Sequence, residues 1–116
     1  MFETTAILYA ETITQDAALN EVKTYTGRKV FVRKTRSISR SEFYQAAAQG
    51  LKPAAVLILF FGDYADEKVI GWQGKVYRIT RTYQRPDSDD IELTIEEAQE
   101  FKNGINEEDE DNDQQP

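Results

Sequence analysis

The chain has 116 residues, which is enough for one domain with one hydrophobic core. It contains neither cysteine nor histidine, which excludes a disulfide framework, thiolate chemistry and histidine-based catalysis or metal binding. No apolar run approaches the roughly 18 residues of a membrane span, and the first residues lack the pattern of a signal peptide. We therefore expect a protein of the cytoplasm that has no membrane partner, cofactor or bound metal and is not an enzyme.

The net charge of −7 is unevenly distributed. Six acidic residues lie among the last ten, and the rest of the chain then has 15 acidic against 14 basic residues. Such a block repels itself and buries nothing, so residues 102–116 are predicted to form a disordered acidic tail. Its simplest role is solubility; the alternatives are contact with a basic partner surface or exclusion of DNA.

The first forty residues favour two strands. Residues 2–12 alternate with period two, which predicts a strand, whereas 14–26 show no clear period and are interpreted as a connection with room for a helical turn at 16–21. Gly27 opens a second predicted strand over 28–37. Between residues 23 and 40 there is no acid, and the basic residues there are Lys23, Arg28, Lys29, Arg33, Lys34, Arg36 and Arg40. This stripe is compatible with nucleic-acid binding or with an ordinary half-exposed strand.

A single convincing helix is predicted at residues 39–50. Ser39 and Glu42 have the spacing of a capping box, and Phe43, Ala46, Ala47 and Leu51 share one helical face. Gly50 favours the left-handed conformation that closes a helix, and Pro53 prevents continuation. A helix of about ten residues is marginal in water unless its apolar face docks on something.

The second half of the chain is predicted to consist of strands. The apolar run 54–62 suits a central strand covered on both faces, and 63–67 is a polar turn expected to be solvated. Strands at 68–72 and 75–83 are joined by Gln73-Gly74, a strong hairpin signal. The turn 85–89 leads to a last strand at 91–95, with Ile91, Leu93 and Ile95 facing inward, and a helical turn is expected near 96–101.

Period two places four side chains of the 75–83 strand on one face. These are Tyr77, Ile79, Arg81 and Tyr83. We expect Tyr77, Ile79 and Tyr83 in the core and Arg81 in an ion pair or cap. Together these elements predict a mainly β fold, a small antiparallel β-barrel of about six strands in a meander. Residues 1–101 would form one domain, with 37–53 as an inserted loop that carries the helix.

Several pieces of the sequence, in this order and spacing, resemble one known family. They are 41–46 (SEFYQA), 50–53 (GLKP), 63–64 (DY), 72–79 (WQGKVYRI), 81–83 (RTY) and 91–93 (IEL). Together they cover roughly half the chain, and they resemble the head closure proteins of long-tailed phages and prophages. These are also called head–tail connector, joining or stopper proteins.

This resemblance implies a structural virion protein at the head–tail interface, present in the host cytoplasm during assembly. It implies a small β-barrel subunit that forms a ring, expected to be dodecameric, below the portal and adaptor and above the tail terminator and tail. The ring retains packaged DNA and receives the tail. The excursion 37–53 would form the channel plug through Arg40, Phe43, Tyr44 and Gln45, and Arg36 and Arg40 would contact phosphate. For Phe43 and Tyr44 the alternative is plain packing onto the barrel. Family-motif residues with structural roles would be Gly50, Pro53, Gly74, Tyr77, Arg81 and Tyr83.

Three alternatives stay open at this point. A nucleic-acid-binding barrel of the oligonucleotide-binding type is supported by the basic stripe with Tyr25 and Phe31 nearby for stacking. Another connector component, the adaptor or the tail terminator, is a neighbouring possibility, although adaptors are expected to be mainly helical. An enzyme would need paired carboxylates or a metal, and the acids gather in a turn and a tail instead.

Overall fold

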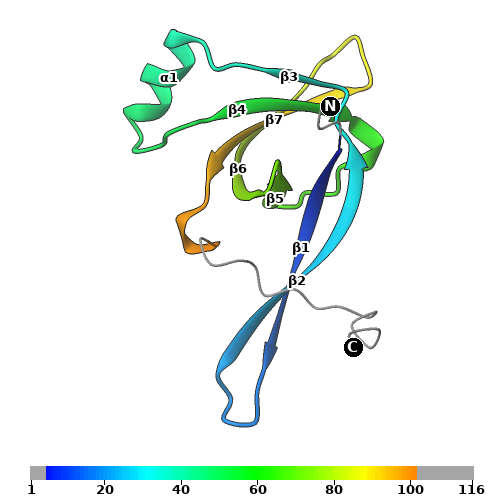
Figure 1. Cartoon of the computed structure of the whole chain (residues 1–116), viewed down its shortest axis with the longest axis vertical. Coiled ribbons are helices and arrows are strands. Elements are labelled where there is room, and N and C mark those ends of the chain that lie inside the picture. Colours follow the sequence, from blue (N-terminus) through cyan, green and yellow to red (C-terminus); the bar gives the residue numbers. More distant parts are fainter. Residues whose placement is uncertain (1–4, 102–116) are drawn as a thin grey trace.

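The computed structural model describes residues 5–101; the predicted acidic tail and residues 2–4 of the first predicted strand lie outside that range. Within it the fold is mainly β, as predicted, with seven strands and one α-helix (Figure 1). The elements are β1 (Thr5–Gln15), β2 (Glu21–Phe31), β3 (Lys34–Arg36), α1 (Arg40–Ala47), β4 (Ala55–Phe60), β5 (Val69–Trp72), β6 (Lys75–Gln84) and β7 (Asp90–Glu97), with short 3₁₀ helices at Phe61–Asp63 and Gln99–Phe101.

The strands form one antiparallel sheet in the order β2-β1-β5-β6-β7-β4-β3. The expected meander is wrong, because β4 pairs with β3 and β7 and leaves β5 to pair with β1. β4 is apolar on both faces and is hydrogen-bonded to β3 along one side and to β7 along the other. In the β4–β7 pair Leu57 lies opposite Leu93. In the described part of the chain β2 and β3 are the two edges and do not pair, so the sheet curls without closing into the expected barrel.

The core lies inside this curl. Its fully buried side chains come from β1, β4, β5 and β7, and they are Leu8, Leu57, Leu59, Ile70, Leu93 and Ile95. Val56 is also fully buried, but it lies on the other face of β4, opposite Thr94. The inward positions predicted for the last strand are confirmed, because Ile91, Leu93 and Ile95 are all buried. Trp72 and Tyr77 pack at one side of this cluster with ring centroids 6.0 Å apart.

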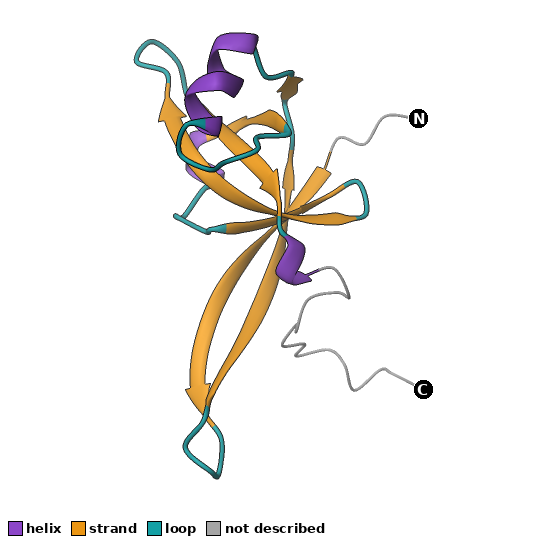
Figure 2. Cartoon of the chain, turned by 90° about the vertical axis from the view of Figure 1, so that its left-hand side faces the viewer, coloured by secondary structure: helices purple, strands orange, loops and turns teal. Residues whose placement is uncertain are grey.

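The predicted connection at 14–26 is wrong. β1 and β2 pair over all eleven residues, from Thr5 opposite Phe31 to Gln15 opposite Glu21, and a turn at Asp16–Asn20 joins them. Beyond the last β5 pair, at Tyr9, the two strands leave the sheet as a ribbon that protrudes from the body (Figures 1 and 2). Every residue from Ala10 to Glu21 is exposed, so no apolar alternation marks the strands in the sequence.

The second predicted strand, 28–37, is two strands separated by a bend. Val32 is buried in the core, and the Arg33 amide donates to the Ile58 carbonyl at 2.8 Å. The chain thus crosses from one edge of the sheet, β2, to the other, β3. The basic residues of this segment therefore divide between two edges.

The hairpin predicted through Gln73-Gly74 is confirmed. Gln73 has φ 52° and Gly74 φ 80°, the two left-handed positions of a type I′ turn. The turn at 85–89 and the central strand 54–62 are also confirmed, and the last 3₁₀ helix falls where a helical turn was predicted. Within residues 5–101, no helix is long and apolar enough to cross a bilayer.

The shared face predicted for the 75–83 strand is wrong beyond Ile79. A β-bulge lies between Ile79 and Arg81, so that Ile79 is opposite Ile95 and Arg81 is opposite Thr94. The extra residue turns the following side chains to the other face of the sheet. Tyr77 and Ile79 are buried as expected, but Tyr83 is 49% exposed and is not a core residue.

Candidate assembly surface

The segment 37–53 leaves the sheet between β3 and β4 as an arm that carries α1 (Figure 1). Its start is the predicted capping box. The Ser39 hydroxyl accepts from the Glu42 amide at 3.1 Å, and the Glu42 carboxylate accepts from the Ser39 amide at 2.9 Å. Gly50 closes the helical segment with φ 80°, which confirms its predicted conformation.

Ion pairs and hydrogen bonds fix the arm at both ends. The guanidinium of Arg36 donates to both oxygens of Glu42, at 3.0 and 3.1 Å, and to Glu92 of β7 at 3.2 Å. At the other end the Lys52 amide donates to the Glu96 carboxylate at 2.6 Å. The arm is thus attached firmly where it leaves and rejoins the sheet.

Between these attachments the helix is poorly packed, since it has no buried residue. Phe43 is 42% exposed and Tyr44 66% exposed, and their rings meet edge to face with centroids 6.4 Å apart. Two exposed aromatic rings side by side on a short helix gain little from their own subunit. They form a small apolar surface that is available to a partner.

A groove separates α1 from the sheet, with a cavity volume of about 420 Å³. Its walls combine apolar and polar side chains from the arm with side chains from β6 and β7: Ile38, Glu42, Gln45, Ala46, Gln49, Leu51, Pro53, Thr80, Arg81 and Thr94. Of the predicted apolar helical face, Ala46 and Leu51 line this groove and Phe43 does not. The helix therefore lies beside the sheet (Figure 2), with the groove between them.

The structure brings four of the five predicted plug residues together on α1, and they differ in availability. Arg40 and Tyr44 are exposed, and Arg40 has no ion pair among the described residues. Gln45 lines the groove. Arg36 lies on β3, and the two carboxylates that hold its guanidinium leave little of it for phosphate, so its place in the structure is that of an anchor.

Arg81 differs from its prediction. It was expected in an ion pair or a cap, but it makes neither within residues 5–101 and its side chain is exposed beside the groove. The bulge in β6 is the reason, because it points Arg81 toward the arm instead of the core. Sequence periodicity alone carries no signal for a bulge.

The basic stripe 23–40 is largely neutralised by acids from distant parts of the chain. Lys23 pairs with Glu11, Arg28 with Glu67, Arg33 with Asp89 and Asp90, and Arg36 with Glu42 and Glu92. Lys29, Lys34 and Arg40 are the members without an ion pair inside the described range. The stripe is therefore a poor nucleic-acid surface in this fold.

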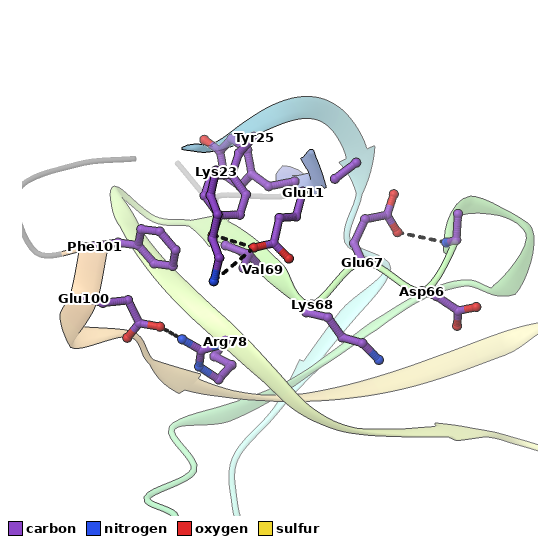
Figure 3. Close-up of a pocket in the computed structure, with 13 residues that line it drawn as sticks. Glu11, Lys23, Tyr25, Asp66, Glu67, Lys68, Val69, Arg78, Glu100 and Phe101 are labelled. Carbon is purple, nitrogen blue, oxygen red and sulfur yellow. Dashed lines mark hydrogen bonds and ion pairs between the residues drawn. The ribbon is translucent and has the colours of Figure 1, made fainter. Parts of the chain in front are cut away.

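A second cavity, of about 760 Å³, lies between the ribbon and the loop before β5 (Figure 3). Some of its charged groups are paired with one another, Lys23 with Glu11 and Arg78 with Glu100, whereas Asp66 and Lys68 have no ion pair among the described residues. Phe101 packs edge to face on Tyr25 at 5.3 Å between ring centroids. Among residues 5–101, no three acidic side chains are placed to hold a metal ion.

Glu67 beside this cavity was predicted to be part of a solvated turn, and that prediction is wrong. Its side chain is buried and accepts from Arg28 at 2.6 Å and from the Ala65 amide at 2.9 Å. Burial alone would raise the pKa of Glu67, but the bonds from Arg28 and Ala65 outweigh it and the pKa lies below its ordinary value. This pair ties β2 to the loop before β5.

The attachment of the arm is expected to resist acid. The Arg36 hydrogen bonds, followed by the Ser39 amide, lower the pKa of Glu42 to about 2 from 4.5. A depressed pKa contributes stability that is present above the unfolded value and is lost as pH falls through the folded one. The capping box should therefore persist at about pH 3 and open near pH 2. A pH titration of the Glu42 side chain by NMR measures this.

The Arg36→Ala variant is the control for that titration. Without the guanidinium, the pKa of Glu42 should rise toward 4.5 and the arm should loosen at a higher pH. An unchanged Glu42 titration in this variant would contradict the assigned role of Arg36.

Comparison with known proteins adds no relative. No protein-family model matches the sequence, and no curated protein matches it significantly.

Proposed function

We propose that this protein is a ring-forming head closure subunit of a phage head–tail connector, which retains packaged DNA and provides the surface for tail attachment. The observation that carries the proposal is the arm 37–53. It is anchored at both ends, yet its helix buries no residue and exposes two aromatic rings. An element held in place but left unpacked is suited to completing its contacts on assembly.

The arm is suited to a plug for two physical reasons. Fixed ends confine Phe43 and Tyr44 to one direction, so that every copy in a ring would present them alike. Each copy need contribute only a weak contact, because simultaneous contacts in a ring reinforce one another. The rings would then narrow a channel by packing between neighbouring arms.

Electrostatics supports a limited role for DNA contact. Arg40, on the first turn of α1, is exposed and unpaired within residues 5–101, so it is the arm cation best placed to meet phosphate. Arg36 is held by Glu42 and Glu92 and would hold the arm rather than bind phosphate. The plug would therefore act mainly by steric closure, with Arg40 and the exposed Lys52 of each copy adding attraction to DNA.

The proposal is tested with DNA-filled capsids that carry portal and adaptor but lack this chain. Added protein is expected to co-sediment with these capsids, to keep their DNA protected from nuclease, and to allow purified tails to attach. The matched control is empty capsids without portal, to which the protein should not bind. If the protein neither binds the filled capsids nor changes DNA release, the proposal is rejected.

A further inference from the structure

The tip of the β1–β2 ribbon exposes a leucine in an unfavourable conformation. Leu19 has φ 68° and is 73% exposed, in a turn where its amide donates to the Asp16 carbonyl at 2.9 Å. A left-handed position that ends a hairpin turn normally carries glycine or asparagine, because a Cβ is strained there. A large apolar side chain at that place has no benefit inside its own subunit, and such strain gathers at functional contacts.

The ribbon needs a partner for a second reason. Beyond Glu11 and Tyr25, where Phe101 packs, it runs about 13 Å further at roughly 3.3 Å per residue, and a two-stranded ribbon is barely stable alone in water. One of its faces carries no charge, with Thr12 opposite Thr24 and Thr14 opposite Val22. Ile13, 53% exposed on the other face, adds to the apolar surface near the tip. Little desolvation cost would oppose burial of these uncharged side chains, whereas Asp16 and Glu21 would need a charged partner.

The tip is acidic and the arm end of the molecule has free cations. No lysine or arginine precedes Lys23 in the sequence, whereas Asp16 and Glu21 both lie at the tip. Near α1, Arg40, Lys52 and Arg81 are exposed and have no ion pair with described residues. Of these cations, Arg81 lines the groove beneath α1.

We propose that the ribbon tip of one copy docks in the groove under α1 of a second copy, with Leu19 entering beside Leu51 and Glu21 facing Arg81. The tip and α1 lie at opposite ends of the long axis, so a chain cannot fill its own groove (Figure 1). A contact between two different surfaces of the same chain is heterologous and propagates head to tail, which closes into a ring when the rotation allows. This inference rests on the proposed function for the closed ring, but the contact itself is testable without capsids.

The first test replaces Leu19 with asparagine. Because asparagine tolerates φ 68° better, Leu19→Asn should leave the thermal midpoint of the monomer unchanged or raised. Self-association, measured by sedimentation equilibrium, should weaken at least about tenfold because the inserted side chain is lost. A purely structural leucine would give the opposite pattern, with lower stability and unchanged association, and that result would overturn the proposal.

The second test exchanges charges. Glu21→Arg and Arg81→Glu should each weaken self-association by about tenfold, and the double variant should recover most of it, since every interface then holds the exchanged pair. Asp87→Arg and Arg85→Glu, in the exposed β6–β7 turn, are the matched controls and should have no effect. If the double variant associates as poorly as the two single variants, the proposed pairing is wrong.

A third test detects weak or transient contact. The chain has no cysteine, so Ala18→Cys with Gln49→Cys places thiols at the tip and in the groove alone. Oxidation should give a ladder of disulfide-linked oligomers, whereas Ala18→Cys with Asp87→Cys should give far less. No ladder, together with no association up to ~1 mM protein, would reject docking on a second copy and leave the tip for another partner.

The two proposals can fail separately. If tip variants retain DNA in capsids normally while arm variants lose it, the docking inference fails and the plug stands. If the charge exchange restores self-association but the protein has no effect on filled capsids, the docking inference stands and the proposed head closure function fails.

Discussion

Replacing Phe43 and Tyr44 together with serine is expected to reduce the capsid-retained DNA at least about tenfold while leaving the fold intact. Both rings are exposed on a helix that buries no residue, so their removal should change the free energy of unfolding by no more than about 0.5 kcal/mol. In an assembled ring every copy would lack the same two aromatic rings, so the loss of contacts between neighbouring arms is multiplied by the number of copies. Nuclease protection of capsid DNA and a thermal melt measure the two effects.

Phe61→Ser is the matched control for this double variant. Phe61 is 43% exposed, close to the 42% of Phe43, but it lies in the 3₁₀ helix after β4 and not on the arm. Capsids closed with the Phe61→Ser variant should retain as much DNA as capsids closed with the unaltered protein. Equal loss of DNA in Phe61→Ser and in the arm variant would mean that general surface apolarity, and not the arm, is responsible.

Replacing Arg28 with alanine is expected to cost about 2 kcal/mol of stability at neutral pH, since it leaves the buried Glu67 carboxylate without its charged partner. For a domain of this size the thermal midpoint should fall by about 10 °C. The value lies below that of a fully buried pair because the Arg28 side chain is 46% exposed. Lys29→Ala is the matched control at the next position and should change stability little.

The loss in Arg28→Ala should depend on pH in a defined direction. In the unaltered protein the pKa of Glu67 is lowered, so the pair contributes stability above the unfolded pKa of 4.5, and this is lost as pH falls through the folded value. In the variant, burial raises the Glu67 pKa instead. The difference in stability between the two proteins should therefore be full at pH 7 and shrink as the pH falls below 4.5 and through the lowered pKa of Glu67. A difference in stability between the two proteins that stays constant from pH 7 to 3 would contradict the assigned ion pair between Arg28 and Glu67.

A large part of the fold was predictable because its signals are local. The capping box at Ser39 and Glu42, the Gln73-Gly74 turn and the apolar run of β4 each depend on residues within a few positions of one another. The arm, which is the candidate site, was therefore located from the sequence. Its exposure could be expected from its length, since a short helix with few apolar residues gains little by docking.

The errors have a different origin. The β1–β2 ribbon was missed because its protruding part is mostly exposed, with Tyr25 its one buried residue among those described, and alternation is readable only where one whole face is apolar. Tyr83 and Arg81 were placed on the wrong face because of the bulge beyond Ile79. The basic stripe appeared free because its acids, Glu67, Asp89 and Glu92 among them, are far away in the sequence.

By itself the sequence determined the class of fold, the helix with its cap, the Gln73-Gly74 and 85–89 turns, the central apolar strand and the inward residues of β7, since each follows from short-range sterics and hydrophobic periodicity. The tertiary structure alone decided which strands pair, that the sheet stays open and which cations are neutralised. It also decided that Leu19 projects in a strained conformation from the ribbon, at the end of the molecule away from the groove under α1. Those features depend on contacts between residues far apart in the chain, which no local pattern encodes.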